Sequence, residues 1–513
     1  MPTALRCLVV ENDPAWQDRL RIDLEALAGG AQVVVAAGPD EARALLHGDD
    51  RYDLATIDIS LLAEPPAGEV DEEGLALVDE FFRDARAAGT ALLVVTGHAT
   101  TERDRRLLRG RNHGVFDIVE KGKYDEKAFL ATVCKALFDS RLRQVESRAG
   151  RQLRLTLSFG RDRWLGCELR GPQNRGPYRP ERPKSFAAAR LAERADGINL
   201  LVENARGWRQ AARRLGIATY KSVQRDSEIA DYLHSAKGLA TREDPLRIDF
   251  AGPASGLAIP FELLCDGGDY LCYEHLMTRR LSQRGLRLAR KAEPFHQFLA
   301  GLVERGEDLR ILLLAPGGGA DLPAAQAEVE LLGDELKVAG RRFGLGVHVR
   351  SLVGPEATSA PVQESLRDGD SHIFHFAGHG GFRDDLPEAS GLVLSDGSIL
   401  RASDLSALVG ATPLRLAFLS CCLSARTAGR LGRGDFQGVP DALARAGVPL
   451  VLGYRWSVAD DGARALAQAF YRSLWRTLSP PQALLDARLS ASMGPLGRED
   501  ETWASPILLS QTD

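Results

Sequence analysis

Two short segments of the chain carry residues with the chemistry of a nucleophile and a base. His379 belongs to HFAGHG (375–380), and LSCCLS (419–424) contains the adjacent residues Cys421 and Cys422. Each segment ends an apolar run that is typical of a buried parallel strand. Because open α/β sheets place their active sites at the carboxyl ends of neighbouring strands, we expect His379 and a cysteine to meet at one sheet edge.

The first 125 residues alternate between apolar runs and segments with helical spacing. The expected strands are residues 5–12, 32–38, 52–62, 91–100 and 114–122. The expected helices between them are residues 13–27, 40–48 and 74–89. Strands that alternate with helices predict a parallel sheet with helices on both faces. Carboxylates at the strand ends are then expected to collect at one edge of that sheet.

Over about residues 4–142 this pattern resembles a response-regulator receiver domain. Such domains carry an acidic pair after the first strand, an aspartate after the third, Ser or Thr after the fourth and lysine after the fifth. The matching residues are Glu11, Asn12, Asp58, Thr96 and Lys121. The resemblance implies a phosphoacceptor at Asp58, Mg²⁺ held by Glu11, Asn12 and Asp58, and phosphoryl oxygens bound by Thr96 and Lys121.

Several residues depart from the receiver pattern. Asn12 stands where a second acid is usual, Ile118 replaces an aromatic switch residue, and Gly122 replaces a proline. The loop at 63–73 is also longer than the family's short turn. Two interpretations follow: a histidine kinase phosphorylates Asp58, or the receiver-shaped module docks a partner protein without being phosphorylated.

Residues 124–153 have helical spacing and become basic toward their end, which predicts a helix that completes the first domain and continues as a linker. Its arginines are interpreted as a solvated helix face, because no aromatic or glycine-rich platform accompanies them. A protease triggered by nucleic acid is the alternative interpretation of the same residues. We expect no nucleic-acid partner.

The middle region is richer in strand signals. Residues 171–185 are rich in Pro and Arg and predict an exposed loop, which would be accessible to a maturation cut. A helix is expected within 198–216. Cys265 and Cys272 lie in apolar surroundings and are interpreted as buried thiols.

From residue 309 a second alternating series begins, and it favours a mostly parallel, doubly wound sheet. The expected strands are residues 309–318, 347–354, 371–380, a hairpin at 392–405, 414–422 and 448–456. The expected helices are residues 324–340, 361–368, 435–447, 460–478 and 479–492.

Residues 155–511 resemble the CHAT domain of the caspase–separase clan of cysteine peptidases. The matching segments are IPFELL, LPAAQAEVELL, HFAGHG, LSCCLS, GVPDALARAGVPLVLGYRWSV and FYRSL. The family pattern L-S-A-C-x-S aligns Cys422 with the nucleophile, and His379 with the histidine of the dyad. The resemblance also implies an oxyanion hole of the Gly380 and Cys422 backbone N–H groups.

Substrate selection by relatives suggests a further pair of candidates. Many relatives bind a basic P1 side chain through an acid, but the position two before the nucleophile is Ser420 here. Asp460 and Asp461 are therefore the candidates for the S1 pocket. The alternative reading makes them a helix N-cap and a first-turn acid.

The bulk composition restricts the class of protein. The chain has 513 residues, 44% hydrophobic and 26% charged, with a net charge of −5 and seven scattered cysteines. We expect no disulfide framework, no signal peptide at MPTALRCLVVEND and no apolar run long enough to cross a membrane. A cytoplasmic location without a membrane partner follows as an expectation.

The predicted fold class is α/β, with a doubly wound, flavodoxin-like receiver domain and a caspase-like domain that has an accessory α+β, pseudo-caspase-like half. The predicted boundaries are residues 1–142 for the receiver-like domain, 143–154 for the linker helix, 155–308 for the non-catalytic part and 309–513 for the catalytic part.

The resemblances imply a bacterial cysteine endopeptidase that cleaves a dedicated protein partner and needs no cofactor for the cleavage. Phosphorylation or docking at the receiver-like domain would control it through the linker helix. The alternative is a non-catalytic signalling adaptor in which both domains serve protein–protein recognition.

Overall fold

The computed structural model describes most of the chain. The described residues are 4–48, 50–61, 73–84, 89–97, 114–203, 207–253, 259–281, 293–317, 323–368, 370–381, 390–410, 412–421, 438–456, 458–494 and 497–512. They form two compact units. The first unit is Met1–Ser147, Leu302–Asp308 and Glu335–Val347, and the second is Arg148–Gly301, Leu309–Asp334 and His348–Asp513. Within the described ranges, no helix has the length and apolar content to cross a bilayer.

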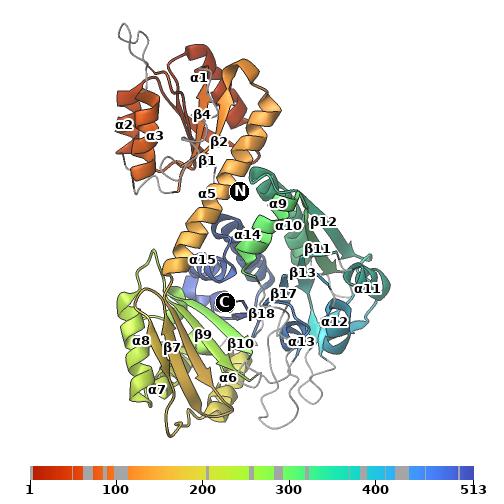
Figure 1. Ribbon diagram of the computed structural model, residues 1–513. Helices are drawn as coiled ribbons and strands as arrows, with labels where there is room; N and C mark the ends of the chain where they lie inside the picture. The colour runs from red at the N-terminus through yellow and green to blue at the C-terminus, as the bar shows by residue number, and fades with distance from the viewer. Residues whose placement is uncertain are drawn as a thin grey trace. The chain divides into compact units, whose positions relative to one another are not determined.

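The first unit contains a parallel sheet of five strands in the order β2-β1-β3-β4-β5 (Figure 1). The N-terminal elements are β1 (Leu5–Val10), α1 (Pro14–Glu25), β2 (Ala31–Ala36), α2 (Pro39–Leu46), β3 (Leu54–Ile57), α3 (Glu73–Arg83), β4 (Ala91–Thr96), β5 (Val115–Glu120), η1 (Lys121–Lys123) and α5 (Glu126–Arg151). This strand order is that of doubly wound, flavodoxin-like sheets, so the fold class predicted for this region is confirmed.

Local sequence explains how these elements begin and what they bury. Asp13 caps α1, since its side chain accepts a hydrogen bond of 2.8 Å from the Ala15 N–H, and Pro14 occupies the first helical position. The residues of β3 and β4 are all buried, as is usual for parallel strands covered on both faces. Apolar residues of α3, including Leu77 and Phe81, pack into the core on one face.

The second unit contains a sheet of eleven strands in the order β12-β11-β13-β17-β18-β19-β10-β9-β6-β7-β8, and a small sheet β14-β15-β16. Its elements up to α10 are β6 (Arg154–Phe159), β7 (Trp164–Arg170), β8 (Arg175–Tyr178), α6 (Ala188–Glu203), α7 (Trp208–Val223), α8 (Ser227–Leu239), β9 (Arg247–Gly252), η3 (Phe261–Leu263), η4 (Leu271–Tyr273), β10 (Leu276–Leu281), α9 (Phe295–Arg305), β11 (Leu309–Pro316) and α10 (Pro323–Arg342). The last residues of α9 and of α10 belong to the first unit.

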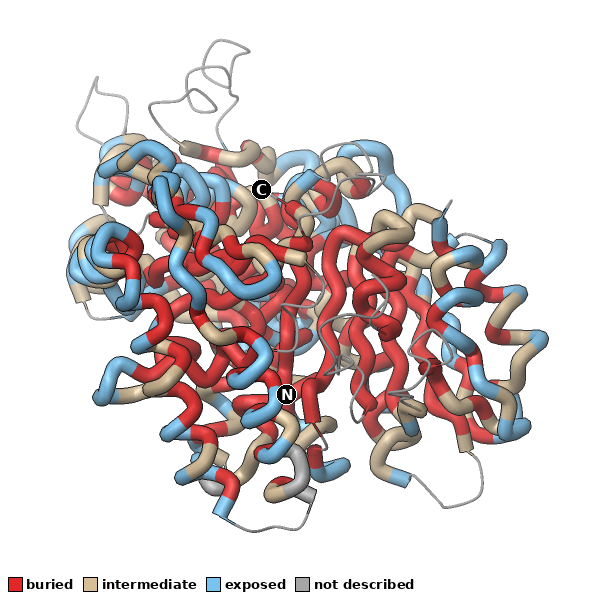
Figure 2. The backbone as a smooth tube through the Cα atoms, turned by 90° about the horizontal axis from the view of Figure 1, so that it is seen from below, coloured by how far each residue is buried: buried red, intermediate tan, exposed pale blue. Residues whose placement is uncertain are grey.

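The remaining elements complete the same large sheet and cover it. They are β12 (Val347–Gly354), α11 (Ser359–Arg367), β13 (Ile373–Gly378), β14 (Gly380–Gly381), β15 (Gly391–Val393), β16 (Ile399–Arg401), α12 (Ala402–Val409), β17 (Leu416–Cys421), α13 (Val439–Arg445), β18 (Leu450–Tyr454), α14 (Asp460–Thr477), α15 (Pro480–Ser492), η6 (Gly497–Glu499), η7 (Glu501–Trp503) and β19 (Pro506–Ser510). In Figure 2 the central strands are almost wholly buried, whereas the outer helices alternate between buried and exposed residues.

Three expectations about individual elements need correction. The expected helix within 198–216 is replaced by two helices, α6 and α7, because the left-handed Gly207 (φ 55°) precedes α7 as its N-cap. The expected loop at 171–185 contains β8, which pairs with β7 at the edge of the sheet. Strand β19 was not expected, and it lies between β18 and β10.

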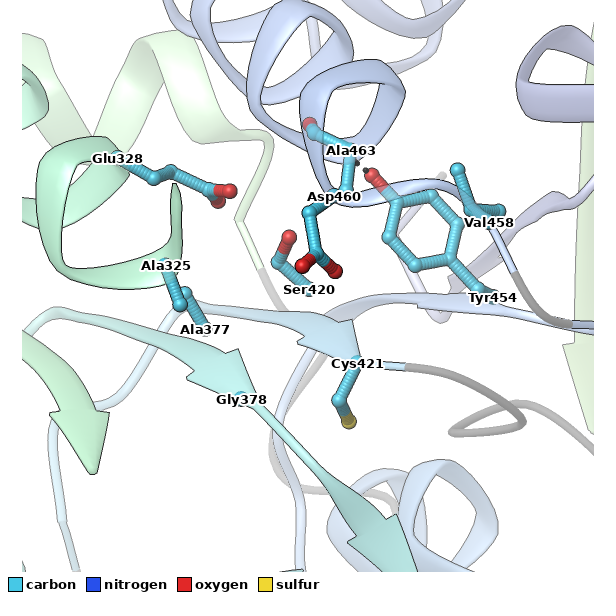
Figure 3. A pocket seen from close by; sticks show the side chains of 10 residues that line it. All are labelled: Ala325, Glu328, Ala377, Gly378, Ser420, Cys421, Tyr454, Val458, Asp460 and Ala463. Carbon is cyan, nitrogen blue, oxygen red and sulfur yellow. Dashed lines mark hydrogen bonds between the residues drawn. The ribbon is translucent and has the colours of Figure 1, made fainter. Parts of the chain in front are cut away.

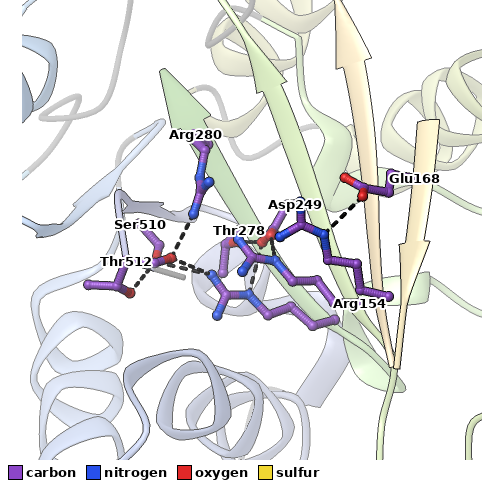
Figure 4. A network of polar contacts seen from close by, with 9 residues as sticks. Arg154, Glu168, Asp249, Thr278, Arg280, Ser510 and Thr512 are labelled. Carbon is purple, nitrogen blue, oxygen red and sulfur yellow. Dashed lines mark hydrogen bonds and ion pairs between the residues drawn. The ribbon is translucent and has the colours of Figure 1, made fainter. Parts of the chain in front are cut away.

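Strand β19 joins the two parts of the large sheet. It pairs antiparallel with β18 over its whole length and parallel with β10. A network of polar side chains fixes its end (Figure 4). Arg280 donates to the Thr512 carbonyl at 2.9 Å, and Arg247 donates to Ser510 Oγ at 3.3 Å. The same Arg247 pairs with the buried carboxylate of Asp249 at 2.9 Å, so β19 is tied to β9 as well as to its neighbours.

Candidate active site

The two strands that were expected to end side by side do so. Strand β13 pairs parallel with β17, and the register runs from Ile373 opposite Leu416 to Gly378 opposite Cys421. Both strands are buried along nearly their whole length because they carry apolar side chains on both faces. The predicted adjacency of HFAGHG and LSCCLS in one sheet is therefore confirmed.

The predicted dyad residues directly follow these two strand ends. His379 comes after β13 and is exposed at the carboxyl edge, while its backbone carbonyl accepts a hydrogen bond of 3.0 Å from Val393 N. Gly380 begins β14, which pairs with β15. Cys422 follows Cys421 in the chain and lies outside the described residues. The structure thus places His379 and Gly380 at the expected edge.

A pocket opens at the carboxyl ends of β13, β17 and β18 (Figure 3). It is lined by Ala325, Glu328, Ala377, Gly378, Ser420, Cys421, Tyr454, Val458, Asp460 and Ala463. The predicted S1 candidate Asp460 is in this set and its neighbour Asp461 is not. Cys421 is buried. The pocket adjoins the strand ends that precede both dyad residues.

The two aspartates at the start of α14 differ in their surroundings. The N-cap of α14 is Ala459, without a side-chain hydrogen bond, so the expectation of an aspartate cap is wrong and both aspartates lie in the first turn. Asp461 pairs with Arg464 at 2.9 Å. Asp460 has no hydrogen-bond or ion-pair partner among the described residues, and Figure 3 shows its carboxylate directed toward Ser420. Asp460 is therefore a carboxylate that can bind a ligand in the pocket.

A buried polar chain lies beside the pocket. Glu328 of α10 pairs with Nε2 of His375 at 2.9 Å, and Nδ1 of His375 lies 3.4 Å from the Tyr471 hydroxyl of α14. Burial raises the pKa of the Tyr471 hydroxyl. Both ring nitrogens of His375 therefore have partners on helices outside the sheet. The role of Glu328 was missed.

A scan against known families matches residues 211–511 to the CHAT domain. The chain belongs to the CHAT domain family. The CHAT domain is part of the caspase-like peptidase clan, which confirms the family predicted from the sequence and the α/β fold class of this region. No curated protein shows a significant match to the chain.

The first unit brings together four of the five residues predicted for a receiver site. Lys121 Nζ lies 2.6 Å from Asp58 Oδ2 and 2.6 Å from Glu11 Oε2. Glu11, Asp58 and Thr96 are buried. Burial raises the pKa of Glu11, while its contact with Lys121 acts in the opposite direction. The carboxylates, the ammonium group and the hydroxyl therefore lie at the carboxyl ends of β1, β3, β4 and β5.

Asn12 leaves this site with two carboxylates instead of three. Among the residues that the structure describes, no group of three or more His, Cys, Asp and Glu side chains could hold a metal ion. Glu11 and Asp58 nevertheless converge on one cationic group, the Lys121 ammonium. Two carboxylates with the Asn12 amide oxygen form a donor set of the kind that Mg²⁺ accepts.

Solved structures similar to the N-terminal part of the chain include several receiver domains. A sensor protein from Polaromonas sp. JS666 is 26% identical, with 27% of this chain and 99% of that chain covered, at a TM-score of 0.22. A response regulator receiver protein from Pseudomonas putida is 26% identical, with 26% of this chain and 98% of that chain covered, at a TM-score of 0.21. A signal receiver domain from an HD domain-containing protein of Pseudomonas fluorescens Pf-5 is 16% identical, with 27% of this chain and 97% of that chain covered, at a TM-score of 0.22.

Proposed function

We propose that this CHAT-domain protein is a regulated cysteine endopeptidase that cleaves a dedicated protein partner. The observation that carries the proposal is the pairing of Gly378 with Cys421 in parallel strands. The next residue along each strand is a member of the predicted dyad, His379 or Cys422. The pairing supports the proposal because a base and a thiol that follow adjacent parallel strand ends can meet for nucleophilic catalysis.

In the proposed mechanism the Cys422 thiolate attacks the carbonyl carbon of the scissile peptide bond. His379 takes the thiol proton and passes it to the leaving amine, which leaves an acyl-enzyme that water hydrolyses. The backbone N–H groups of Gly380 and Cys422 stabilise the oxyanion. None of these steps requires a metal or an organic cofactor.

The proposed peptidase is tested by incubating the purified full chain with a diverse peptide library and reading the cleavage sites by mass spectrometry. Specific cleavage supports a peptidase and reports its P1 preference. Absence of cleavage, together with slow reaction of every thiol with an electrophilic probe, would favour the adaptor instead.

The substrate preference is proposed to follow from Asp460. Since its carboxylate lines the pocket beside the strand ends, the S1 site is expected to bind a basic P1 side chain. Asp460→Asn should lower kcat/KM for Arg and Lys peptides by about tenfold to a hundredfold, because the charge partner is lost. The measurement is cleavage of peptides that differ only at P1.

Asp461→Asn is the matched control, since Asp461 is adjacent, exposed and paired with Arg464. It should leave the P1 preference as it is. Equal effects of the two substitutions, or equal cleavage of Arg and Leu peptides by the unmodified protein, would contradict the assignment of Asp460 to S1.

Control of the peptidase is proposed to lie in the receiver-like site of the first unit. Asp58 is the proposed phosphoacceptor, Thr96 and Lys121 bind the phosphoryl oxygens, and Glu11 and Asn12 complete a Mg²⁺ site with Asp58. The Mg²⁺ ion would neutralise the charge of the incoming phosphoryl group. The proposed partner is a histidine kinase, with a docking protein on the same face as the alternative.

Asp58→Asn is expected to abolish both phosphorylation by acetyl phosphate and any change of peptidase rate that this phosphodonor causes. Intact-mass spectrometry detects the acyl phosphate, and peptide cleavage reports the rate. Asp18→Asn, at an exposed aspartate of α1, is the control and should respond like the unmodified protein. Peptidase kinetics that are the same with and without the phosphodonor would rule out control by phosphorylation.

A further inference from the structure

We propose that residues 160–225 of the second unit carry a docking surface for an acidic segment of a partner protein. This basic surface consists of six cationic side chains: Arg161, Arg163, Arg182, Lys184, Lys221 and Arg225. The inference goes beyond the proposed peptidase, because binding at this surface needs neither His379 nor Cys422.

The charge of the chain is unevenly distributed. Residues 161–225 contain 13 Arg and two Lys but only six Asp and Glu, which is a net charge of +9, whereas the whole chain carries −5. The other residues therefore sum to −14. A local excess of this size, opposite in sign to the rest of the chain, attracts an anionic partner.

The fold brings three segments of this region together. The turn between β6 and β7 pairs with the segment before α6, since Arg163 forms a β-bridge with Ser185. In the same pairing, Trp164 N donates to the Lys184 carbonyl at 3.2 Å. The end of α7 joins them, because Lys184 Nζ donates to the Arg225 carbonyl at 2.9 Å. Arg225 in turn donates to the Ser185 carbonyl at 3.0 Å, so the cations of three segments lie on one surface.

The basic surface is not neutralised by the protein itself. All six cationic side chains are exposed, and none forms an ion pair with a described residue. Two of the three acids in these segments cap helices instead: Asp162 accepts from Ala188 N at 2.7 Å, and Asp226 accepts from Ile229 N at 3.3 Å. Glu181 is the third. Clustered like charges repel one another, and an acidic partner would offset this repulsion.

The surroundings favour an acidic protein segment over a nucleic acid. The two aromatic residues of the three segments, Trp164 and Phe186, are buried and cannot stack on bases. The N-terminus of α6 could attract a phosphate, but Asp162 already accepts from Ala188 N there. Leu165 follows the turn and is 48% exposed, so it offers an apolar contact beside the cations. An acidic segment that also carries apolar residues matches both features.

The basic surface also lies at an edge of the sheet that suits binding. Strand β6 pairs parallel with β9, and the turn at 160–163 follows the carboxyl end of β6. Ligands of α/β sheets bind at the carboxyl ends of parallel strands. Arg242 precedes β9 and therefore belongs to the opposite edge, where it can serve as a control.

The test measures the binding of a defined acidic peptide to the full chain. The probe is a fluorescein-labelled peptide of repeated Glu-Glu-Leu, which has no Arg or Lys for the proposed S1 site, and fluorescence anisotropy reports its binding. The peptide should bind at low salt, and added salt should weaken the binding because exposed charges are screened. A Glu-Glu-Ser peptide of the same length and charge should bind more weakly, since it lacks the apolar contact.

A triple variant with Arg161→Gln, Arg163→Gln and Lys221→Gln should lower the affinity for the Glu-Glu-Leu peptide by about tenfold or more, because three exposed charge pairs are lost. These three side chains form no hydrogen bond or ion pair with a described residue, so the fold does not depend on them. Thermal unfolding of the variant checks that it folds as the unmodified protein does.

The matched control is a second triple variant with Arg242→Gln, Arg350→Gln and Arg367→Gln. These arginines are also exposed, form no ion pair with a described residue and lie on other elements of the second unit. The control removes the same number of charges and should bind the peptide as the unmodified protein does. It therefore separates the basic surface from the overall charge of the chain.

Each outcome supports or overturns the proposal. Loss of affinity in the first triple variant alone supports the docking surface. Equal losses in the two triple variants would mean that the peptide responds only to overall charge, and the proposal fails. It also fails if no peptide binds, or if the Glu-Glu-Ser peptide binds as tightly as the Glu-Glu-Leu peptide. Duplex DNA that binds more tightly than the peptide, and only when the basic surface is intact, would assign this surface to nucleic acid instead.

Discussion

Cys422→Ala is expected to lower peptide cleavage by about a thousandfold or more, because a peptidase of this type has no second route once its nucleophile is gone. His379→Ala should act on the same step, since the thiol then lacks the base that keeps it reactive. The two losses should not add in the double variant, because the pair works as a unit. Single-turnover kinetics on an Arg peptide measures all three variants.

Thiol labelling provides the control for this first prediction. An electrophilic probe should modify Cys422 much faster than buried thiols, and His379→Ala should slow that reaction. Cys167 is buried in β7, and burial raises its pKa to about 12, so it should stay unmodified. The Cys167→Ala variant should therefore be labelled at Cys422, and should cleave peptide, as the unmodified protein does. Cleavage that survives in Cys422→Ala would exclude the proposed nucleophile.

Asp249→Ala is expected to lower the free energy of unfolding of the second unit by about 3–5 kcal/mol, as is typical when one partner of a buried ion pair is removed. Asp249 is 1% exposed and pairs with Arg154 and Arg247. Thr278 also donates to its carboxylate. Without Asp249, two largely buried guanidinium groups face each other without their shared anion. Urea unfolding followed by circular dichroism measures the loss.

The effect of Asp249 should also depend on pH in a defined direction. Burial alone would raise the pKa of Asp249, but Arg247 and Arg154 outweigh it and hold the pKa below its usual range. A lowered folded-state pKa contributes stability above the unfolded-state pKa of about 3.9, and this contribution is lost as the pH falls through the folded-state value. The difference between the unmodified protein and Asp249→Ala should therefore shrink in acid.

Glu168→Ala serves as the comparison for Asp249→Ala, since Glu168 belongs to the same network but pairs with the more exposed Arg170 (Figure 4). Exposed pairs contribute little, so this change should stay within about 0.5 kcal/mol of the unmodified protein. Equal losses in Asp249→Ala and Glu168→Ala would mean that the buried network does not stabilise the unit in the way described.

Much of the fold could be predicted because the sequence pattern is local and repetitive. Runs such as those around Phe374 and Phe418 are apolar on both faces, which is typical of a covered parallel strand. Strand adjacency followed from the order of elements, and it correctly placed the HFAGHG and LSCCLS segments side by side. The pattern also predicted that carboxylates at strand ends collect at one edge of the first sheet, where Glu11 and Asp58 both contact Lys121.

Other features depend on pairings between distant residues, which periodicity does not report. In the sequence, the residues of β19 form one more short apolar run. No local pattern predicts that this strand pairs with both β18 and β10. Glu328 and His375 are 47 residues apart and meet only after α10 packs on β13. A glutamate on an otherwise apolar helix face was the available signal. Likewise, Asp460 and Asp461 are equivalent in the sequence pattern, but only Asp460 lines the pocket and only Asp461 pairs with Arg464.

Because β19 comes late in the chain but lies in the middle of the large sheet, its position determines when this sheet can be completed during synthesis. The strands of the two parts of the large sheet are complete by the end of β18, but the strand that joins them is the last described one. A nascent chain that has reached only residue 505 contains both parts of the sheet and not their connection. During synthesis, the two parts can therefore collapse separately before they are united. Strand β19 then unites the two parts, because it pairs with β18 of one part and with β10 of the other.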